Sequence, residues 1–232
     1  MMRINKYIAH SGYTSRRKAD ELIFKGKVKL NGQTIKEPGV QVHDNDVVEI
    51  DGKVLSIEKK FYIKLYKPIG FITSNFDPYN EKDLNDLVDI DKRFFASGRL
   101  DKDSEGLLII TNDGEFTNNL IHPKFKLDKE YIVKVDSKLS KNQENEFENG
   151  LDIGNGEKTS DAKIEYLGNN VYKVIIHQGY NRQIRRMFKV LGKKVIALKR
   201  IKIGKISLSD LKEKEYRYFD SEELKFVEEI RR

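Results

Sequence analysis

The sequence predicts an α+β protein with a small N-terminal unit, residues 1–58, and a larger unit, residues 59–232. Three observations support this fold class. The first sixty or so residues combine helical apolar spacing with short alternating segments that fit strands. The remainder carries hairpin signals and amphipathic helices. It lacks the regular strand–helix alternation of a parallel α/β fold. We therefore expect a compact helix-and-strand module followed by a mostly antiparallel mixed sheet flanked by helices.

Local signals place the elements of the first unit. Apolar residues at helical spacing over residues 4–8 predict a first helix. Ser15 is a suitable N-cap, and Gly26 a suitable terminator, for a second helix in "RRKADELIFKG". Asn31-Gly32 lies inside the alternating segment "KVKLNGQTI" and is typical of a type I′ hairpin. Two further short strands are expected in "VQVHDNDVVEIDG".

The second unit alternates hairpin and helix signals. Ser140 and Gln143 form a capping box that begins a helix ending at Gly150. Asp220 is positioned to cap the last helix. Strands are expected at residues 61–68, 107–114 and 129–136, a hairpin at 162–179, and further helices at 114–121, 181–192 and 221–230.

Composition limits the possible classes of protein. The chain has 44 Lys and Arg against 37 Asp and Glu, a net charge of +7, which suits an anionic partner. The absence of cysteine excludes disulfides, thiolate catalysis and cysteine zinc sites. No apolar stretch approaches the ~20 residues needed to span a bilayer, and the N-terminus does not match a secretory signal. We expect a cytoplasmic protein with no membrane association.

Basic residues cluster on the second helix and the strand that follows. A solvated helix face is the ordinary explanation for such a cluster. However, Arg16 and Arg17 occupy the first turn, where the helix dipole disfavours cations and free N–H groups favour phosphate. We therefore expect RNA contact from Arg16, Arg17, Lys18 and Lys27. The pattern "INKYIA…GYTSRRKADELI…GKVKLNG" resembles the S4 RNA-binding domain across the whole first unit.

The stretch "DKDSEG" has three possible explanations. Asp101 and Asp103 resemble the start of a calcium-binding loop, but the twelfth position is Asn112 instead of a bidentate Glu. The two carboxylates could instead only shape a turn. The apolar strand that follows would hold Asp101 rigidly at a sheet edge, which is what a catalytic group needs. We favour catalysis and expect no bound metal.

The stretch "GYNRQIRRMF", residues 179–188, predicts an anion-binding helix start. Gly179 and Asn181 allow a tight turn, and Arg182, Arg185 and Arg186 would lie opposite the apolar face. A basic, solvated helix face is the alternative. One of these arginines could also pair with a carboxylate.

Four motifs in order, "LYKPIGFITS", "GRLDKDSEGLLIITNDGE", "KEYIVKV" and "GYNRQIRRMF", resemble those of pseudouridine synthases. The resemblance is to the RsuA/RluB/RluF branch, which joins an S4 domain to the catalytic domain. It spans essentially the entire chain and implies isomerisation of uridine to pseudouridine in RNA. No cofactor is implied.

The resemblance also implies roles for individual residues. Asp101 is the essential carboxylate, acting as a nucleophile on the sugar or as a base. Tyr131 stacks on the flipped base, and removal of the C5 proton is a second role left open. Arg185 pairs with Asp101, and Arg99 holds the space that the base vacates. Arg182 and Arg186 contact phosphates, and Asn181 belongs to the same RNA-binding segment.

The similarity points most closely to enzymes of large-subunit ribosomal RNA. Small-subunit ribosomal RNA and tRNA remain alternative substrates. A non-catalytic RNA-binding ribosome-assembly factor is the alternative class of function. We expect a monomer whose partner is ribosomal RNA, either free or within an assembling subunit.

Overall fold

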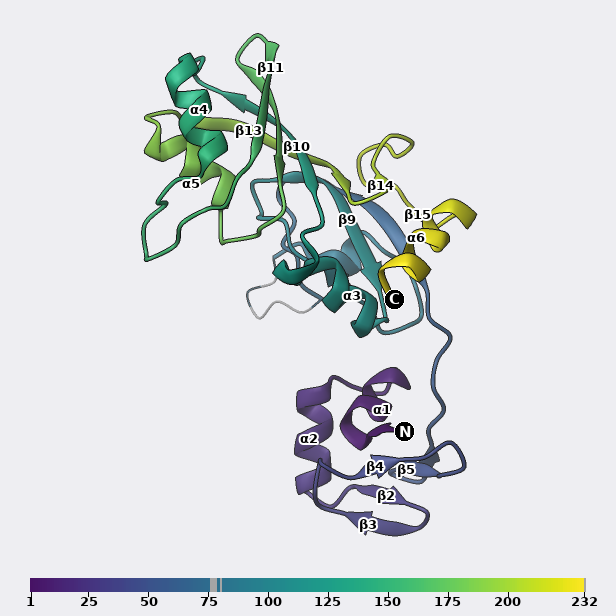
Figure 1. The fold of residues 1–232 in the computed structure, drawn as a ribbon. Helices are drawn as coiled ribbons and strands as arrows, with labels where there is room; N and C mark the ends of the chain where they lie inside the picture. The colour runs from purple at the N-terminus through teal and green to yellow at the C-terminus, as the bar shows by residue number, and fades with distance from the viewer. Residues whose placement is uncertain (76–78, 80, 232) are drawn as a thin grey trace. The chain divides into compact units, whose positions relative to one another are not determined.

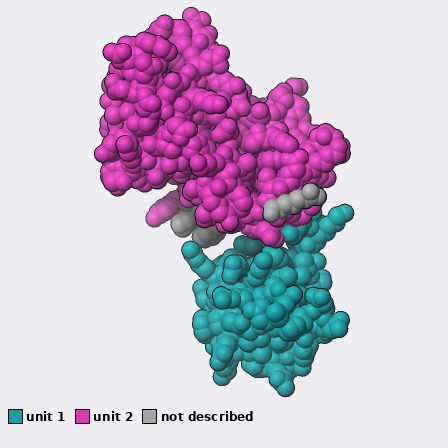
Figure 2. Space-filling model, in the orientation of Figure 1, with its two compact units in different colours: residues 1–61, 90–94 teal, residues 62–89, 95–232 magenta. Residues whose placement is uncertain are grey.

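The computed structural model describes residues 1–75, 79 and 81–231, in which the chain forms two compact units. The first comprises residues 1–61 and 90–94, and the second residues 62–89 and 95–232 (Figure 2). The domain boundary predicted between residues 58 and 59 stays a prediction. No helix in the described part of the chain is long and apolar enough to cross a membrane.

The first unit packs two helices against small sheets (Figure 1). Strands β2, β3, β5 and β6 form one sheet in the order β3-β2-β5-β6, while β1 pairs with β4. The elements are β1 Met2–Arg3, α1 Ile4–His10, α2 Arg16–Phe24, β2 Val28–Leu30, β3 Gln33–Ile35, β4 Gln41–Val42, β5 Val48–Ile50 and β6 Lys53–Val54. The predicted α+β character is confirmed in this unit.

Local sequence signals explain most of this first unit. The Ser15 side chain accepts a hydrogen bond from the Lys18 backbone at 3.3 Å and so caps α2. Asn31 and Gly32 have φ of 50° and 80°, as a type I′ turn between β2 and β3 requires. The core contains apolar residues from both helices and from the strands: Ile4, Ile8, Ala19, Ile23, Val28, Val42, Val48, Ile50 and Leu55.

The second unit is organised around a mixed sheet with the order β11-β12-β10-β13-β9-β7-β15. Its strand pairs are antiparallel except for β9 with β13, which run parallel. The strands are β7 Tyr62–Lys67, β8 Phe95–Ser97, β9 Glu105–Thr111, β10 Lys129–Val135, β11 Lys163–Gly168, β12 Val171–Ile176, β13 Val195–Ile203, β14 Ile206–Ser207 and β15 Tyr216–Tyr218. The predicted mostly antiparallel mixed sheet is confirmed.

Helices cover two parts of this sheet. Figure 1 shows α4 and α5 beside β10, β11 and β13, while α3 and α6 lie beside β9 and β15. The helices are α3 Gly114–Ile121, α4 Lys141–Asn149, α5 Gln183–Val190 and α6 Ser221–Arg231, with 3₁₀ turns at Leu84–Asp86 and Pro123–Phe125. The predicted capping box of Ser140 and Gln143 is present, and Asp220 accepts hydrogen bonds from Glu222 and Glu223.

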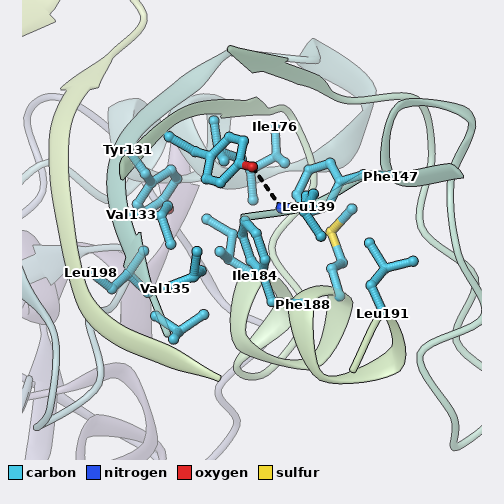
Figure 3. Close-up of a cluster of buried hydrophobic side chains, with 14 of the residues drawn as sticks. Tyr131, Val133, Val135, Leu139, Phe147, Ile176, Ile184, Phe188, Leu191 and Leu198 are labelled. Carbon is cyan, nitrogen blue, oxygen red and sulfur yellow. Dashed lines mark hydrogen bonds between the residues drawn. The ribbon is translucent and has the colours of Figure 1, made fainter. Parts of the chain in front are cut away.

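The buried side chains of this unit form separate clusters. One packs α4 and α5 onto β10, β12 and β13 and includes Tyr131, Phe147, Tyr172 and Phe188. In Figure 3, Tyr131, Val133 and Leu198 lie at the side of this cluster away from Phe147 and Leu191. Another packs α3 and α6 onto β7 and β9. Tyr131 thus belongs to the edge of a rigid core.

The parallel contact between β9 and β13 is unusually close. Gly106 pairs with Arg200 in the register, and a Cβ on Gly106 would lie 2.2 Å from the Arg200 carbonyl oxygen. The φ of Gly106 is +109°, which side chains rarely adopt. A glycine is therefore required where the loop of Asp101 enters the sheet.

The strand β4 pairs with β1 and not with the following strand β5. One helix start differs from the sequence-based expectation. Helix α5 begins at Gln183, because Arg182 adopts a left-handed conformation with φ of 49° and ψ of 33°. The helix thus begins two residues later than the predicted start at residue 181.

Candidate active site

A pocket of about 500 Å³ lies at the ends of several strands of the second unit. Its walls come from the loop between β8 and β9, from β10, from the segment between β12 and α5, and from β13. Asp101, Tyr131, Arg99, Asn181 and Arg182 all line it. Residues that the sequence singled out in three separate motifs are therefore brought together.

The loop of Asp101 is held on both sides by the "LYKPIGFITS" segment. The Thr73 hydroxyl donates to the Leu100 carbonyl at 2.6 Å and accepts from the Leu100 N–H at 3.1 Å. The Gly70 N–H donates to the Lys102 carbonyl at 2.8 Å. Because its neighbours are fixed in this way, the Asp101 carboxylate, 32% exposed, is presented from a rigid loop.

A buried lysine forms hydrogen bonds at the end of the same loop. The Lys67 ammonium donates to the carbonyls of Pro68 and Ser104, both at 2.9 Å. Burial lowers the pKa of Lys67 to about 8, while the negative charge of Asp101 opposes that shift. Lys67 therefore ties the end of β7 to the start of β9.

Arg182 is the arginine closest to Asp101. Its guanidinium forms a bidentate pair with Asp103 at 2.9 and 2.8 Å and lies 3.6 Å from an Asp101 oxygen. The hydrogen bond from Arg182 holds the pKa of Asp103 below its usual value, and the nearby Arg185 adds to this effect. Asp103 thus fixes the guanidinium that faces Asp101.

The expected pairing of Arg185 with Asp101 is wrong in this structure. Arg185 donates to the Asp103 carbonyl at 2.7 Å and to the Ser104 hydroxyl at 3.2 Å. Its Nε lies 3.4 Å from the Asp103 carboxylate. The turn after Asp101 presents Asp103 to α5, so Arg185 reaches that carboxylate first. Arg185 therefore stabilises the loop through Asp103 and Ser104.

Arg186 also differs from the expectation. Its guanidinium donates to the carbonyls of Ile153 at 3.0 and 2.7 Å, Gly154 at 2.8 Å and Asn181 at 3.2 Å, and it pairs with Glu157. These partners use its donors to hold the 153–157 loop onto α5. The structure therefore assigns Arg186 to packing, and it lies outside the pocket lining.

Tyr131 lies on β10 with 7% of its surface exposed. It pairs with Val174 of β12 on one side and with Arg200 of β13 on the other. Arg99 is exposed at the same pocket. A flat, rigidly held aromatic ring beside a carboxylate can hold a planar base against a reacting sugar.

Among the pocket-lining residues, sequence reasoning missed two cations, Lys129 and Arg200. Lys129 could have been found, because strand alternation places it on the same face as Tyr131. Arg200 lies in the basic run "LKRIKIGK", where only the pairing of β13 with β10 and β9 shows which cation enters the pocket.

The predicted RNA-contacting residues of the first unit are all exposed. Arg16, Arg17 and Lys18 form the first turn of α2, and Lys27 follows the helix just before β2. Their contact with RNA stays a prediction.

The rigidly held carboxylate, the buried tyrosine and the surrounding cations fit an RNA-modifying enzyme. The chain belongs to the RNA pseudouridylate synthase family, whose model matches residues 36–189, and an S4 domain model matches residues 2–48. The predicted family is thereby confirmed.

Individual relatives agree with this assignment. The ribosomal large subunit pseudouridine synthase B of Bacillus subtilis is 42% identical, and the match covers 91% of this chain and 89% of the relative. The dual-specificity RNA pseudouridine synthase RluF of Escherichia coli is 38% identical, covering 96% and 77%. A crystal structure of a pseudouridylate synthase superposes with a TM-score of 0.72 at 31% identity, covering 99% of this chain and all of that one.

Proposed function

We propose that the chain converts a specific uridine of large-subunit ribosomal RNA to pseudouridine. The observation that carries this proposal is the shared pocket of Asp101 and Tyr131, with Arg182 3.6 Å from the Asp101 carboxylate. The name of the Bacillus subtilis relative supports the large subunit as the source of the RNA.

In this proposal Asp101 reacts with the sugar of a uridine that has left its stack. The carboxylate either attacks C1′ or removes a proton from C2′, and both routes break the bond from C1′ to N1. Arg182 attracts and orients the carboxylate, and Asp103 fixes Arg182 in turn. Tyr131 holds the base while it rotates, with removal of the C5 proton as its second role.

RNA binding extends beyond the pocket. Extrusion of the uridine costs a few kcal/mol in lost stacking, which interactions with the backbone must offset. Arg99 and Asn181 are available at the pocket, while Arg16, Arg17, Lys18 and Lys27 supply cations on the first unit. The proposal includes a monomer acting in the cytoplasm on free ribosomal RNA or on an assembling subunit.

The test is pseudouridine mapping of total RNA at single-nucleotide resolution, with and without the gene. We expect one large-subunit site to disappear on deletion and to return with the wild-type gene but not with Asp101→Asn. A site lost from small-subunit RNA or from tRNA would identify that RNA as the substrate instead. If no site is lost, the chain is a non-catalytic RNA-binding protein.

The Asp101→Asn variant needs a binding control. The substitution removes a negative charge from a partly exposed side chain, and we expect the fold to stay intact. We therefore expect its RNA affinity to equal or exceed that of the wild type. A variant that no longer binds RNA would not identify Asp101 as the reacting group.

A further inference from the structure

Two cations in the pocket, Lys129 and Arg200, form no ion pair with a carboxylate of the described residues. Arg200 is only 3% exposed, and Lys129 is partly buried. Among the residues that the structure describes, no ion pair joins either side chain to a carboxylate, whereas Arg182 and Arg185 both contact Asp103. An unpaired buried cation is costly to folding. These two residues, called the cation pair below, therefore serve a purpose other than stability of the fold.

Each member of the cation pair has a donor to spare. The Lys129 ammonium donates to the carbonyls of Leu127 and His177, both at 3.3 Å, and has three hydrogens to give. Arg200 donates through Nε to the Leu107 carbonyl at 2.8 Å and through Nη1 to the Arg99 carbonyl at 3.2 Å. Its Nη2 is buried, and no described residue forms a hydrogen bond with it.

The sheet register places the cation pair around Tyr131. Lys129 lies two residues before Tyr131 on β10, and Arg200 is the residue opposite Tyr131 on β13. Ile176 pairs with Lys129, Leu198 lies two residues before Arg200, and both line the pocket. Figure 3 shows Tyr131, Ile176 and Leu198 in the same apolar cluster. A flat ring with carbonyl oxygens fits these surroundings better than a phosphate does.

The charges of the cation pair reinforce each other. Burial and the nearby Arg200 guanidinium lower the pKa of Lys129 to about 8, although Asp128 opposes the shift. The two groups therefore create a positive potential in this part of the pocket before any substrate enters. Such a potential acts on a group that acquires negative charge there.

We propose that Lys129 and Arg200 hold the carbonyl oxygens of the target uracil and stabilise its negative charge when the glycosidic bond breaks. This inference rests on the function proposed above. When the bond from C1′ to N1 breaks, its electron pair stays on the base, and the charge spreads over N1, O2 and O4. C1′ either bonds to the Asp101 carboxylate or becomes part of a glycal after loss of the C2′ proton.

Both routes release the same uracil anion, so the role of the cation pair does not depend on the choice. After rotation of the base, C5 bonds to C1′. In the first route this bond displaces the Asp101 carboxylate from C1′, and in the second route C2′ of the glycal regains its proton. The C5 proton is then lost to a base, and N1 gains a proton. Product and substrate are isomers, and only the intermediate carries the charge that the two cations stabilise.

The experiment compares Lys129→Gln and Arg200→Gln with the wild type on two RNAs, one with uridine and one with 5-fluorouridine at the target. Glutamine keeps an N–H donor and removes the charge. Fluorine withdraws electrons, so the fluorinated anion needs less stabilisation from the protein. Single-turnover loss of the target nucleoside is measured for both RNAs, together with Kd.

We expect each variant to lose roughly 100-fold in rate on the uridine RNA, as for removal of one oxyanion donor. The loss on the fluorinated RNA should be smaller by about fivefold or more, equivalent to about 1 kcal/mol. The Kd should change little. Lys134→Gln, which removes an exposed cation from β10, should leave both rates unchanged.

Equal losses on the two RNAs would overturn the inference, because a structural defect does not depend on the leaving group. So would a weakened Kd with an unchanged rate, which would indicate a phosphate contact. If Arg200→Gln does not fold, the Lys129→Gln variant alone tests the inference. The introduced glutamine can still donate hydrogen bonds to the neighbouring carbonyls, so this variant is expected to fold. A wild-type protein inactive on uridine RNA would instead refute the proposed function.

Discussion

Two arginines share the carboxylate of Asp103, whose side chain is 48% exposed. Arg182 bonds to it through both nitrogens of its fork, and Arg185 approaches from α5. Asp103 therefore positions the groups around Asp101 without lining the pocket itself. We therefore expect Asp103 to affect catalysis only by holding these groups in place.

Asp103→Asn should slow isomerisation more than it weakens RNA binding. A hydrogen bond to a charged group contributes about 1.5 kcal/mol at the lower end of its range, which suits an exposed carboxylate. We expect the single-turnover rate to fall about tenfold with Kd nearly unchanged. An unchanged rate would show that Arg182 keeps its position without Asp103.

The pH dependence of folding supplies a control for this prediction. The folded-state pKa of Asp103 lies below the ordinary 3.8, so its stabilisation is fully present above that pH. It is lost as the pH falls through the lower, folded-state value. Urea unfolding should therefore show a difference between wild type and Asp103→Asn near pH 6 that shrinks below pH 3.8.

Among the elements, the parallel contact of β9 with β13 determines the geometry of the pocket. It brings the loop of Asp101, which leads into β9, next to the strand that carries Arg200 and Leu198. Antiparallel pairing then sets Arg200 opposite Tyr131 on β10. The position of the Asp101 carboxylate relative to the Tyr131 ring thus depends on one strand contact.

Gly106→Ala should disrupt this contact. Its Cβ would lie 2.2 Å from the Arg200 carbonyl oxygen, which belongs to the backbone and cannot turn away. We expect a loss of at least about 3 kcal/mol in the free energy of unfolding, or no folded protein. Urea denaturation followed by circular dichroism provides the measurement.

Gly168→Ala is the matched control for this substitution. Its φ of +93° is similarly positive, but a Cβ added there would have no atom within 4 Å. The cost should therefore be limited to backbone strain of about 1 kcal/mol. Equal costs at the two positions would show that the close approach to β13 is unimportant.

Across the whole molecule, each unit has its own hydrophobic core and its own set of exposed or pocket-lining cations. The basic residues of α2 lie on the S4 unit, whereas Asp101 and Tyr131 lie on the synthase unit. This separation predicts that RNA affinity and chemistry can be changed independently.

The double substitution Arg16→Ala and Arg17→Ala should weaken RNA binding and reduce its salt dependence. For each phosphate that an arginine no longer neutralises, the slope of log K against log salt should fall in magnitude by roughly 0.7 to 0.9. The rate at saturating enzyme should stay unchanged. Lys53→Ala, an exposed cation of β6, should leave the slope as it is. An unchanged slope in the double variant would identify α2 as an ordinary solvated surface.

The sequence by itself determined the local structure and the family of the protein. The cap at Ser15, the turn at Asn31-Gly32 and the capping box at Ser140 depend on residues a few positions apart. Such short-range interactions can be recognised from residue types alone. The motifs around Asp101 and Tyr131 likewise identified the family before any tertiary contact was known.

The tertiary structure alone decided which charges meet. Arg185 pairs with Asp103 and not Asp101, because the turn at residues 101–104 presents the second carboxylate to α5. Arg186 instead donates to the carbonyl of Ile153, 33 residues earlier in the chain. Arg200 enters the pocket because β13 lies between β9 and β10. Strand order and register arise from packing across the whole unit, so no local pattern in the sequence specifies them.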